Sequence, residues 1–156
     1  MSSTAATTQL GKLRILIAED NKADVLLIRE ALQEHGLDYE AEVASDGEQA
    51  FAFLQRVGSS PEIPLHLVLL DLNLGTHHGT EVLAQIRKMP RLLRVPVVVL
   101  TSSDSPLDRQ RVQTLGADLY IRKPLDLDAF LRIGGQIAEV LRQRGPALFA
   151  AGLSIE

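Results

Sequence analysis

The sequence has no cysteine, and this absence excludes several classes of protein at once. Disulfide-stapled scaffolds, thiolate zinc sites, iron–sulfur centres and cysteine nucleophiles all need a thiol that the chain does not have. A chain without disulfides fits the reducing cytosol, so we expect a cytoplasmic protein.

The sequence also lacks an excess of positive charge and a long apolar run. Its 156 residues include 16 Lys and Arg against 20 Asp and Glu, and this balance argues against nucleic-acid binding. The longest apolar runs, such as Val95–Leu100, are far shorter than the roughly 20 residues that cross a bilayer. Residues 1–9 have no basic start and no apolar stretch, so they do not form a secretory signal. We therefore expect a protein that binds neither nucleic acid nor membrane.

The chain does contain a regular alternation of strand and helix patterns. Hydrophobic residues make up 46 % of it, which is usual for a globular domain. Continuous apolar runs predict strands buried on both faces of a parallel sheet, at Leu13–Ala18, Leu65–Leu70 and Val95–Leu100. The run Tyr39–Ala44 alternates apolar and acidic residues, which suits an edge strand, and a fifth short run covers Leu119–Ile121.

Helical patterns follow these strands, as the spacing of Val25, Ile28 and Leu32 indicates. Residues suited to helix ends punctuate them: Gly36, Ser45 with Glu48, Gly79, Ser105 with Pro106, Gly116 and Asp126. The sequence therefore predicts an α/β fold, a doubly wound five-stranded parallel sheet with helices on both faces. We expect a disordered tail at 1–12, one domain at 13–144 and a C-terminal extension at 145–156.

Polar residues stand where the predicted strands end. Glu19 and Asp20 follow the first strand, Asp71 the third, Thr101 the fourth and Lys123 the fifth. In an open parallel sheet the carboxyl ends of the strands form the ligand-binding edge. Crowded carboxylates need a cation, and an all-oxygen set with open positions suits Mg²⁺. With Lys123 as a second positive charge, Asp71 is the natural nucleophile toward phosphorus, giving an acyl phosphate.

The segments around these residues resemble the receiver domains of two-component response regulators. The resemblance covers about residues 13–144 and rests on Glu19-Asp20, LLDLNL around Asp71, VVVLTSS around Thr101, and Lys123-Pro124. It implies the flavodoxin-like strand order 2-1-3-4-5 and a single-domain response regulator that a sensor histidine kinase phosphorylates. The segments DLNL, VVVLT and YIRKPLDLDAF are most similar to the stand-alone receivers that partner bacterial phytochromes.

The resemblance also implies a metal-binding set. Asp71 would become 4-aspartylphosphate, and Asp20 and Asp71 would bind Mg²⁺ directly. Glu19 would act through water, and Asn73 would offer its backbone carbonyl. The sequence departs from the family pattern at two positions: Glu19 replaces the more frequent Asp, and Gly75 stands where a proline commonly follows DLNL.

The remaining implied roles concern the phosphoryl group and the switch. Thr101 would hydrogen-bond the phosphoryl group, Lys123 would pair with it, and Tyr120 would change rotamer with it. Lys123-Pro124 would be a cis peptide. The protein would catalyse its own phosphotransfer and autodephosphorylation and would signal by protein contact, without being an enzyme on a separate substrate.

Several of these residues also have purely structural interpretations. Tyr120 fits a half-buried strand aromatic as well as a switch, and Thr101 could cap the helix that follows it. Adjacent His77 and His78 raise the idea of a metal or phosphorelay site, but neighbours one apart rarely face the same ligand. The basic stretch Arg87–Arg94 could bind an acidic partner or simply complement a helix dipole.

Other functions remain as alternatives to the kinase-driven receiver. An aspartyl-phosphate hydrolase would need DxDx[TV] after the first strand, where this chain has Glu19-Asp20-Asn21-Lys22. A phosphorelay shuttle and an unphosphorylated, receiver-like binding scaffold both stay open. Nucleotide binding is disfavoured because neither GxxxxGK[ST] nor GxGxxG occurs.

The last helical pattern raises the question of a partner. Ile133 and Val140 fall beside the expected core stripe of Leu127, Phe130, Leu131, Ile137, Ala138 and Leu141. Two apolar residues seven apart on an exposed flank would indicate a homodimer. We expect it to form through the helix that begins at Pro106, the strand Leu119–Ile121 and the helix that follows Asp126.

Overall fold

In this computed structural model, which describes residues 12–144, strands and helices alternate along the chain. The elements are β1 (Leu13–Ala18), α2 (Lys22–Glu34), β2 (Tyr39–Ala44), α3 (Gly47–Ser59), β3 (Leu67–Leu70), β4 (Asn73–Leu74), β5 (His77–His78), α4 (Gly79–Lys88), the 3₁₀ turn η1 (Pro90–Leu92), β6 (Val97–Thr101), α5 (Pro106–Thr114), β7 (Leu119–Arg122) and α6 (Leu127–Arg144).

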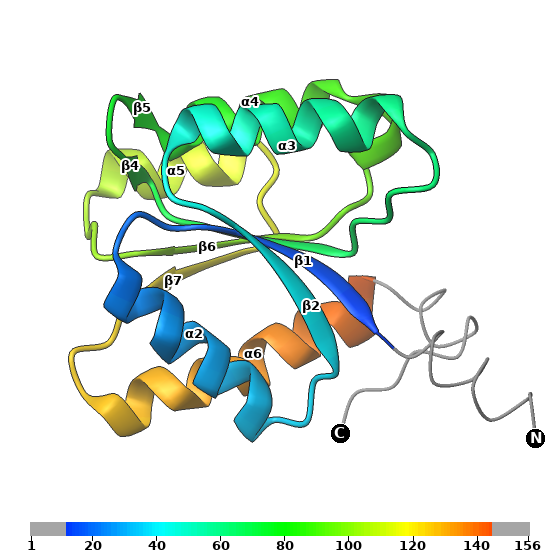
Figure 1. Cartoon of the computed structure of the whole chain (residues 1–156). Coiled ribbons are helices and arrows are strands. Elements are labelled where there is room, and N and C mark those ends of the chain that lie inside the picture. Colours follow the sequence, from blue (N-terminus) through cyan, green and yellow to red (C-terminus); the bar gives the residue numbers. More distant parts are fainter. Residues whose placement is uncertain (1–11, 145–156) are drawn as a thin grey trace, which may run out of the picture.

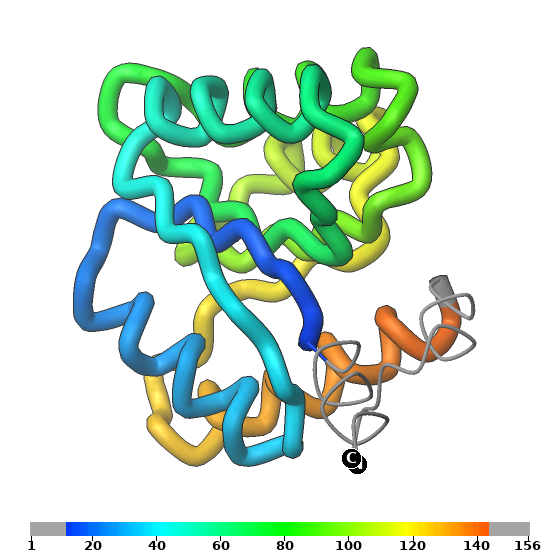
Figure 2. The backbone as a smooth tube through the Cα atoms, turned by 45° about the vertical axis from the view of Figure 1, so that its right-hand side comes forward, coloured from blue at the N-terminus to red at the C-terminus, as the bar shows by residue number. Residues whose placement is uncertain are grey.

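Five parallel strands form the central sheet in the order β2-β1-β3-β6-β7, so the predicted flavodoxin-like fold is confirmed. Helices α3, α4 and α5 cover one face of the sheet, and α2 and α6 cover the other (Figures 1 and 2). Within residues 12–144, the predicted edge strand β2 pairs on one side only, with β1. This order places the carboxyl ends of β1, β3 and β6 side by side.

The sheet separates two apolar cores because neighbouring strand residues point to opposite faces. From β1, Ile15 and Ile17 pack toward α2 and α6, while Leu16 and Ala18 pack toward α3 and α4. All four are at most 1 % exposed. Continuous apolar strands therefore supply both layers, as expected for a sheet covered on both faces.

The structure corrects some element boundaries. Asp46, not Ser45, is the N-cap of α3, and its side chain accepts a hydrogen bond from the Gln49 N–H at 2.8 Å. Ser45 instead donates from its own N–H to the Gln49 side chain. The short hairpin of β4 and β5 was not predicted, because two-residue strands have no periodicity to detect.

Helix α6 contradicts the expected exposed flank. Ile133 is 1 % exposed and Val140 8 %, and both belong to the core beneath α2 and α6. Leu127, expected in the core, is 55 % exposed. The physical reason lies at Gly134, where the absence of a side chain lets α6 approach the Ala31 carbonyl of α2 and widens the buried arc.

Two predictions remain, one about the terminal segments and one about membrane spans. The predicted tail at 1–12 and extension at 145–156 lie outside the described residues, apart from Lys12, so both stay predictions. Within 12–144, none of the helices combines the length and apolar content that a membrane span requires.

Candidate functional site

The sheet brings the predicted polar residues together at one edge. Glu19 and Asp20 directly follow β1, Asp71 follows β3, Thr101 is the last residue of β6, and Lys123 follows β7. Carboxylate oxygens of Glu19, Asp20 and Asp71 lie within 4.8 Å of one another. Glu19, Asp71 and Thr101 are the polar side chains buried in the described part of the chain, whereas Asp20 is exposed. The cluster is therefore buried on one side and open to solvent on the other.

Lys123 lies at the centre of this cluster. Its Nζ is 2.8 Å from Glu19 Oε1, 3.0 Å from Asp71 Oδ2 and 2.7 Å from Asp24 Oδ2. The Asp71 carboxylate also accepts a hydrogen bond of 3.2 Å from the N–H of Asn73. One ammonium thus contacts three carboxylates, and this contact holds the Asp71 oxygens in place.

Burial and crowding shift the acid–base properties of the cluster. The pKa of Glu19 is raised from 4.5 to about 7. Burial is the largest cause and the negative charge of Asp71 adds to it, while the hydrogen bond from Lys123 opposes both. Burial lowers the pKa of Lys123, but its hydrogen bonds to Asp24, Glu19 and Asp71 outweigh burial and raise that pKa above its ordinary value. Lys123 therefore stays charged at neutral pH, while Glu19 is poised to ionise near neutrality.

The donor set fits a divalent cation. Asp20 and Asp24 add to Glu19 and Asp71, so four carboxylates face one ammonium at this edge. Carboxylates that outnumber the ammonium leave negative charge uncompensated, and this charge favours the binding of a further cation. Oxygen ligands with an opening to solvent match the preferences of Mg²⁺ and Mn²⁺.

Thr101 and Tyr120 are connected through the loop that follows β6. Thr101 Oγ1 accepts a hydrogen bond from the N–H of Ser103 at 3.3 Å, and the Tyr120 hydroxyl donates to the Ser103 carbonyl at 2.8 Å. Ser105 is the N-cap of α5, as predicted, so Thr101 is not that cap. Tyr120 is half-buried, with its ring against the core under α3 and α4.

Sequence reasoning missed Asp24 and Ser103. Asp24 lies in the first turn of α2, and the Asn21 N-cap accepts a hydrogen bond from its N–H at 3.1 Å. The first turn of a helix that follows a strand lies at the carboxyl end of the sheet, and this position was the available signal. Ser103 contacts Thr101 and Tyr120 through its backbone N–H and carbonyl, and backbone groups have no signature in the side-chain sequence.

The adjacent histidines and the basic stretch Arg87–Arg94, for which binding roles were considered, make structural contacts. His78 is the N-cap of α4, and the His77 ring packs edge-on against Phe51 at 5.2 Å. Arg87 donates to the Gly116 and Val95 carbonyls, and Arg91 to the Ser60 carbonyl. These contacts tie loops together within the chain.

The predicted cis peptide at Lys123-Pro124 is wrong, because residues 12–144 contain no cis bond. The trans form is the one that an X–Pro bond intrinsically favours. The Lys123 N–H, which precedes this bond, donates to the Thr101 carbonyl at 2.7 Å.

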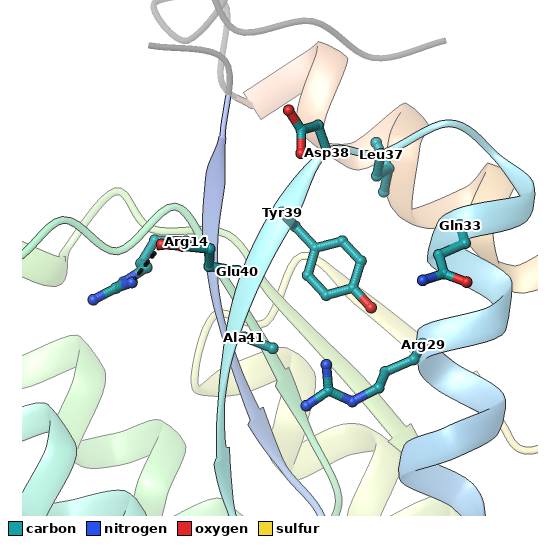
Figure 3. A pocket seen from close by; sticks show the side chains of 8 residues that line it. All are labelled: Arg14, Arg29, Gln33, Leu37, Asp38, Tyr39, Glu40 and Ala41. Atoms are coloured by element: carbon teal, nitrogen blue, oxygen red, sulfur yellow. Dashed lines mark hydrogen bonds and ion pairs between the residues drawn. The ribbon is translucent and has the colours of Figure 1, made fainter. Parts of the chain in front are cut away.

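A pocket of about 550 Å³ lies beside β2, and it is separate from the acidic cluster (Figure 3). Arg29 and Tyr39 line it on the α2 side of the strand, and Arg14 pairs with Glu40 on the other side. Tyr39 is the first residue of β2, so this pocket lies at the amino end of that strand. It does not form part of the candidate site.

Comparisons with known proteins agree with the fold. Residues 15–133 match the response regulator receiver domain family. Response regulator Rcp1 from Synechocystis sp. is 42 % identical over 123 residues, which are 78 % of this chain and 84 % of Rcp1. The chain therefore belongs to the response regulator receiver domain family, and it is a signalling protein of the kind that receives its phosphoryl group from a histidine kinase.

Two solved structures are similar over most of their length. The Mn²⁺-bound form of Rcp1 has a TM-score of 0.72 and 39 % identity, with 81 % of this chain and 92 % of that chain covered. The phosphorylated cyanobacterial phytochrome response regulator RcpA has a TM-score of 0.74 and 38 % identity, with 83 % and 93 % covered.

Proposed function

We propose that Asp71 accepts a phosphoryl group from the phosphohistidine of a sensor histidine kinase. The observation that carries this proposal is the position of the Asp71 carboxylate, 3.0 Å from Lys123 Nζ and beside the Glu19 and Asp20 carboxylates. In the transfer, an Asp71 oxygen forms a bond to phosphorus as the phosphorus–nitrogen bond of the donor breaks. Phosphoryl transfer depends mainly on positioning and on neutralising charge, and Lys123 does both.

The metal assigned to this site is Mg²⁺. Asp20 and Asp71 would bind it directly, Glu19 through water and Asn73 through its backbone carbonyl. When bound, the ion supplies positive charge beside the phosphoryl oxygens. Support comes from the clustered carboxylates and from the Mn²⁺-bound structure of a relative.

After transfer, the phosphoryl group adds up to two negative charges at the sheet edge. The Thr101 hydroxyl would turn to donate a hydrogen bond to it, and Tyr120 would change rotamer as Thr101 moves. The domain would then signal through protein contact from the cytoplasm, and water would return it to rest by hydrolysing the acyl phosphate at its own site.

The relatives support a particular class of kinase. Similarity to Rcp1 and to the phytochrome response regulator RcpA supports a bacterial phytochrome as the phosphodonor. A phosphorelay shuttle that passes the group onward remains the alternative. An unphosphorylated scaffold is disfavoured because Lys123 and the buried Asp71 are positioned for chemistry rather than only for packing.

Intact-mass measurement after incubation with acetyl phosphate and Mg²⁺ tests the proposal. We expect the wild type to gain one phosphoryl group, with no gain in EDTA or in Asp71→Asn. Asp38→Asn, an exposed acid before β2, is the matched control and should gain the group normally. Labelling that persists in Asp71→Asn or in EDTA would refute the assignment.

The homodimer through α5, β7 and α6 loses its original argument, because Ile133 and Val140 are core residues. The same face still includes β7, which in the described part of the chain is an edge strand and pairs only with β6. Dimerisation therefore stays a prediction, which the mass of the chain in solution by light scattering tests directly.

A further inference from the structure

The first turn of α5 is connected to both residues of the proposed switch. Asp108 Oδ2 accepts a hydrogen bond of 2.8 Å from Ser103 Oγ. The same Ser103 donates from its N–H to Thr101 Oγ1 and accepts at its carbonyl from the Tyr120 hydroxyl. Asp108 is therefore one residue removed from both Thr101 and Tyr120.

The next residue of α5 contacts the switch directly. The Arg109 guanidinium lies over the Tyr120 ring, 4.4 Å from its centroid. Such a contact attracts the cation to the ring face and opposes rotation of the ring. Two neighbouring residues of one helical turn thus hold the Tyr120 hydroxyl, through Ser103, and the Tyr120 ring.

Asp108 is itself well fixed. Its N–H donates to the Ser105 cap at 3.3 Å, and its side chain is only 20 % exposed. Its second oxygen lies 3.7 Å from His78 Nε2, in the hairpin that follows Asp71. A carboxylate held from several sides forms a stronger, charge-assisted hydrogen bond with Ser103 than a mobile surface acid would.

On the basis of the proposed function, we propose that Asp108 and Arg109 clamp Thr101 and Tyr120 in their resting positions and so limit how readily the domain switches. A phosphoryl group shifts the domain only by the difference in its interaction with the two states. The clamp stabilises the resting state, so its removal raises the resting population of the switched state. Asp108 acts through Ser103 and is a positioning residue.

Three variants and one control test the clamp. Asp108→Ala removes the acceptor, Ser103→Ala removes the donor but keeps the backbone contacts, and the double variant removes both. The control is Asp104→Ala in the same loop, an acid with a 72 % exposed side chain that lies 3.6 Å from Arg122. Ser103→Ala keeps the test available if Asp108→Ala does not fold.

The first readout is the NMR spectrum of the unphosphorylated full chain. We expect the Tyr120 ring and Thr101 signals of Asp108→Ala and Ser103→Ala to move toward their positions in the phosphorylated wild type. The double variant should move no further than either single variant, because both changes break one hydrogen bond. The control should retain the wild-type signals.

The second readout is the rate of phosphorylation by acetyl phosphate with Mg²⁺. We expect about a threefold or larger increase in Asp108→Ala and Ser103→Ala, but not in the control. Wild-type Tyr120 and Thr101 signals in both resting variants, or shifts that add in the double variant, would overturn the clamp. A wild type that is never phosphorylated would refute the proposed function alone. The clamp is then still tested in the resting proteins, because it predicts that the Tyr120 and Thr101 signals leave their wild-type positions in both single variants and move no further in the double variant.

Discussion

The carboxyl-end edge of the sheet and the contact between α2 and α6 are built on opposite principles. At the edge, Glu19 and Asp71 are 2 % and 4 % exposed, so like charges are buried beside one another. At the helix contact, Gly134 allows α6 to pack against the α2 backbone, and Ile133 and Ile137 are buried there. Burying like charges costs free energy, whereas close apolar packing gains it.

This difference shows that the contact between α2 and α6 stabilises the fold, whereas the buried charges at the carboxyl-end edge destabilise it. The helix contact leaves no space for a side chain at Gly134, and none of the candidate site residues lies in it. The acidic edge is where the proposed chemistry lies, and its ionised form is costly, because burial and the Asp71 charge raise the pKa of Glu19. A substitution in the helix contact should therefore lower stability without affecting phosphorylation. Removing a charge from the acidic edge should instead raise stability and impair phosphorylation.

The largest expected effect is that of Gly134→Ala. The new Cβ would overlap the Ala31 carbonyl oxygen and approach His35 Nδ1 to 2.5 Å, and the backbone of α2 cannot yield as a side chain does. We expect a loss of about 3 kcal/mol in the free energy of unfolding, measured with urea. Phosphorylation of the folded fraction should be unchanged.

Gly135→Ala is the matched control. Its Cβ would meet only the end of the His35 ring, at 3.2 Å, and alanine is the better helix former. We expect a change of less than about 1 kcal/mol in either direction. Equal stabilities of the two variants would show that close approach at Gly134 does not support the contact.

The next effect is the pH dependence of stability, measured in EDTA. The pKa of Glu19 is raised from 4.5 to about 7, so its contribution to stability is complete below the unfolded value and is lost as pH rises through the folded one. Between pH 4.5 and 8 the wild type should lose about 2 kcal/mol that Glu19→Gln does not lose. Urea unfolding of both proteins at several pH values measures the difference.

A second group titrates in the same range and must be separated from Glu19. Burial lowers the pKa of His66, whose Nδ1 accepts a hydrogen bond from the Arg14 N–H, so its contribution is present at high pH and lost as pH falls. This contribution is common to wild type and Glu19→Gln and cancels in their difference. Parallel pH profiles of the two proteins would contradict the assigned role of Glu19.

Much of the fold could be predicted because the pattern of each apolar run indicates whether one or both faces of the strand are buried. Continuous runs such as Leu13–Ala18 require cover on both faces, and the alternating run Tyr39–Ala44 suits an edge. The prediction of an exposed flank on α6 was wrong because helical periodicity assumes that the neighbouring helix packs at an average distance. Because Gly134 has no side chain, α2 packs closer than this average distance, and Ile133 and Val140 become buried.

Predictions for the site were uneven for a similar reason. Asp71 and Lys123 stand at strand ends, so their convergence follows from topology alone. The contact between Lys123 and Asp24, and the Ser103 backbone groups that meet Thr101, depend on side-chain direction and loop path. Neither can be read from residue order.

One pair of measurements on Asp71→Asn tests the central claim most directly, namely that the Asp71 carboxylate lowers the stability of the fold and is the group that accepts the phosphoryl group. Removing the Asp71 charge relieves Glu19, so in EDTA at pH 8 the variant should be about 1 kcal/mol more stable to urea than the wild type. The same preparation, given acetyl phosphate and Mg²⁺, should gain no phosphoryl group. A variant that is less stable than the wild type, or that still becomes phosphorylated, would contradict this account.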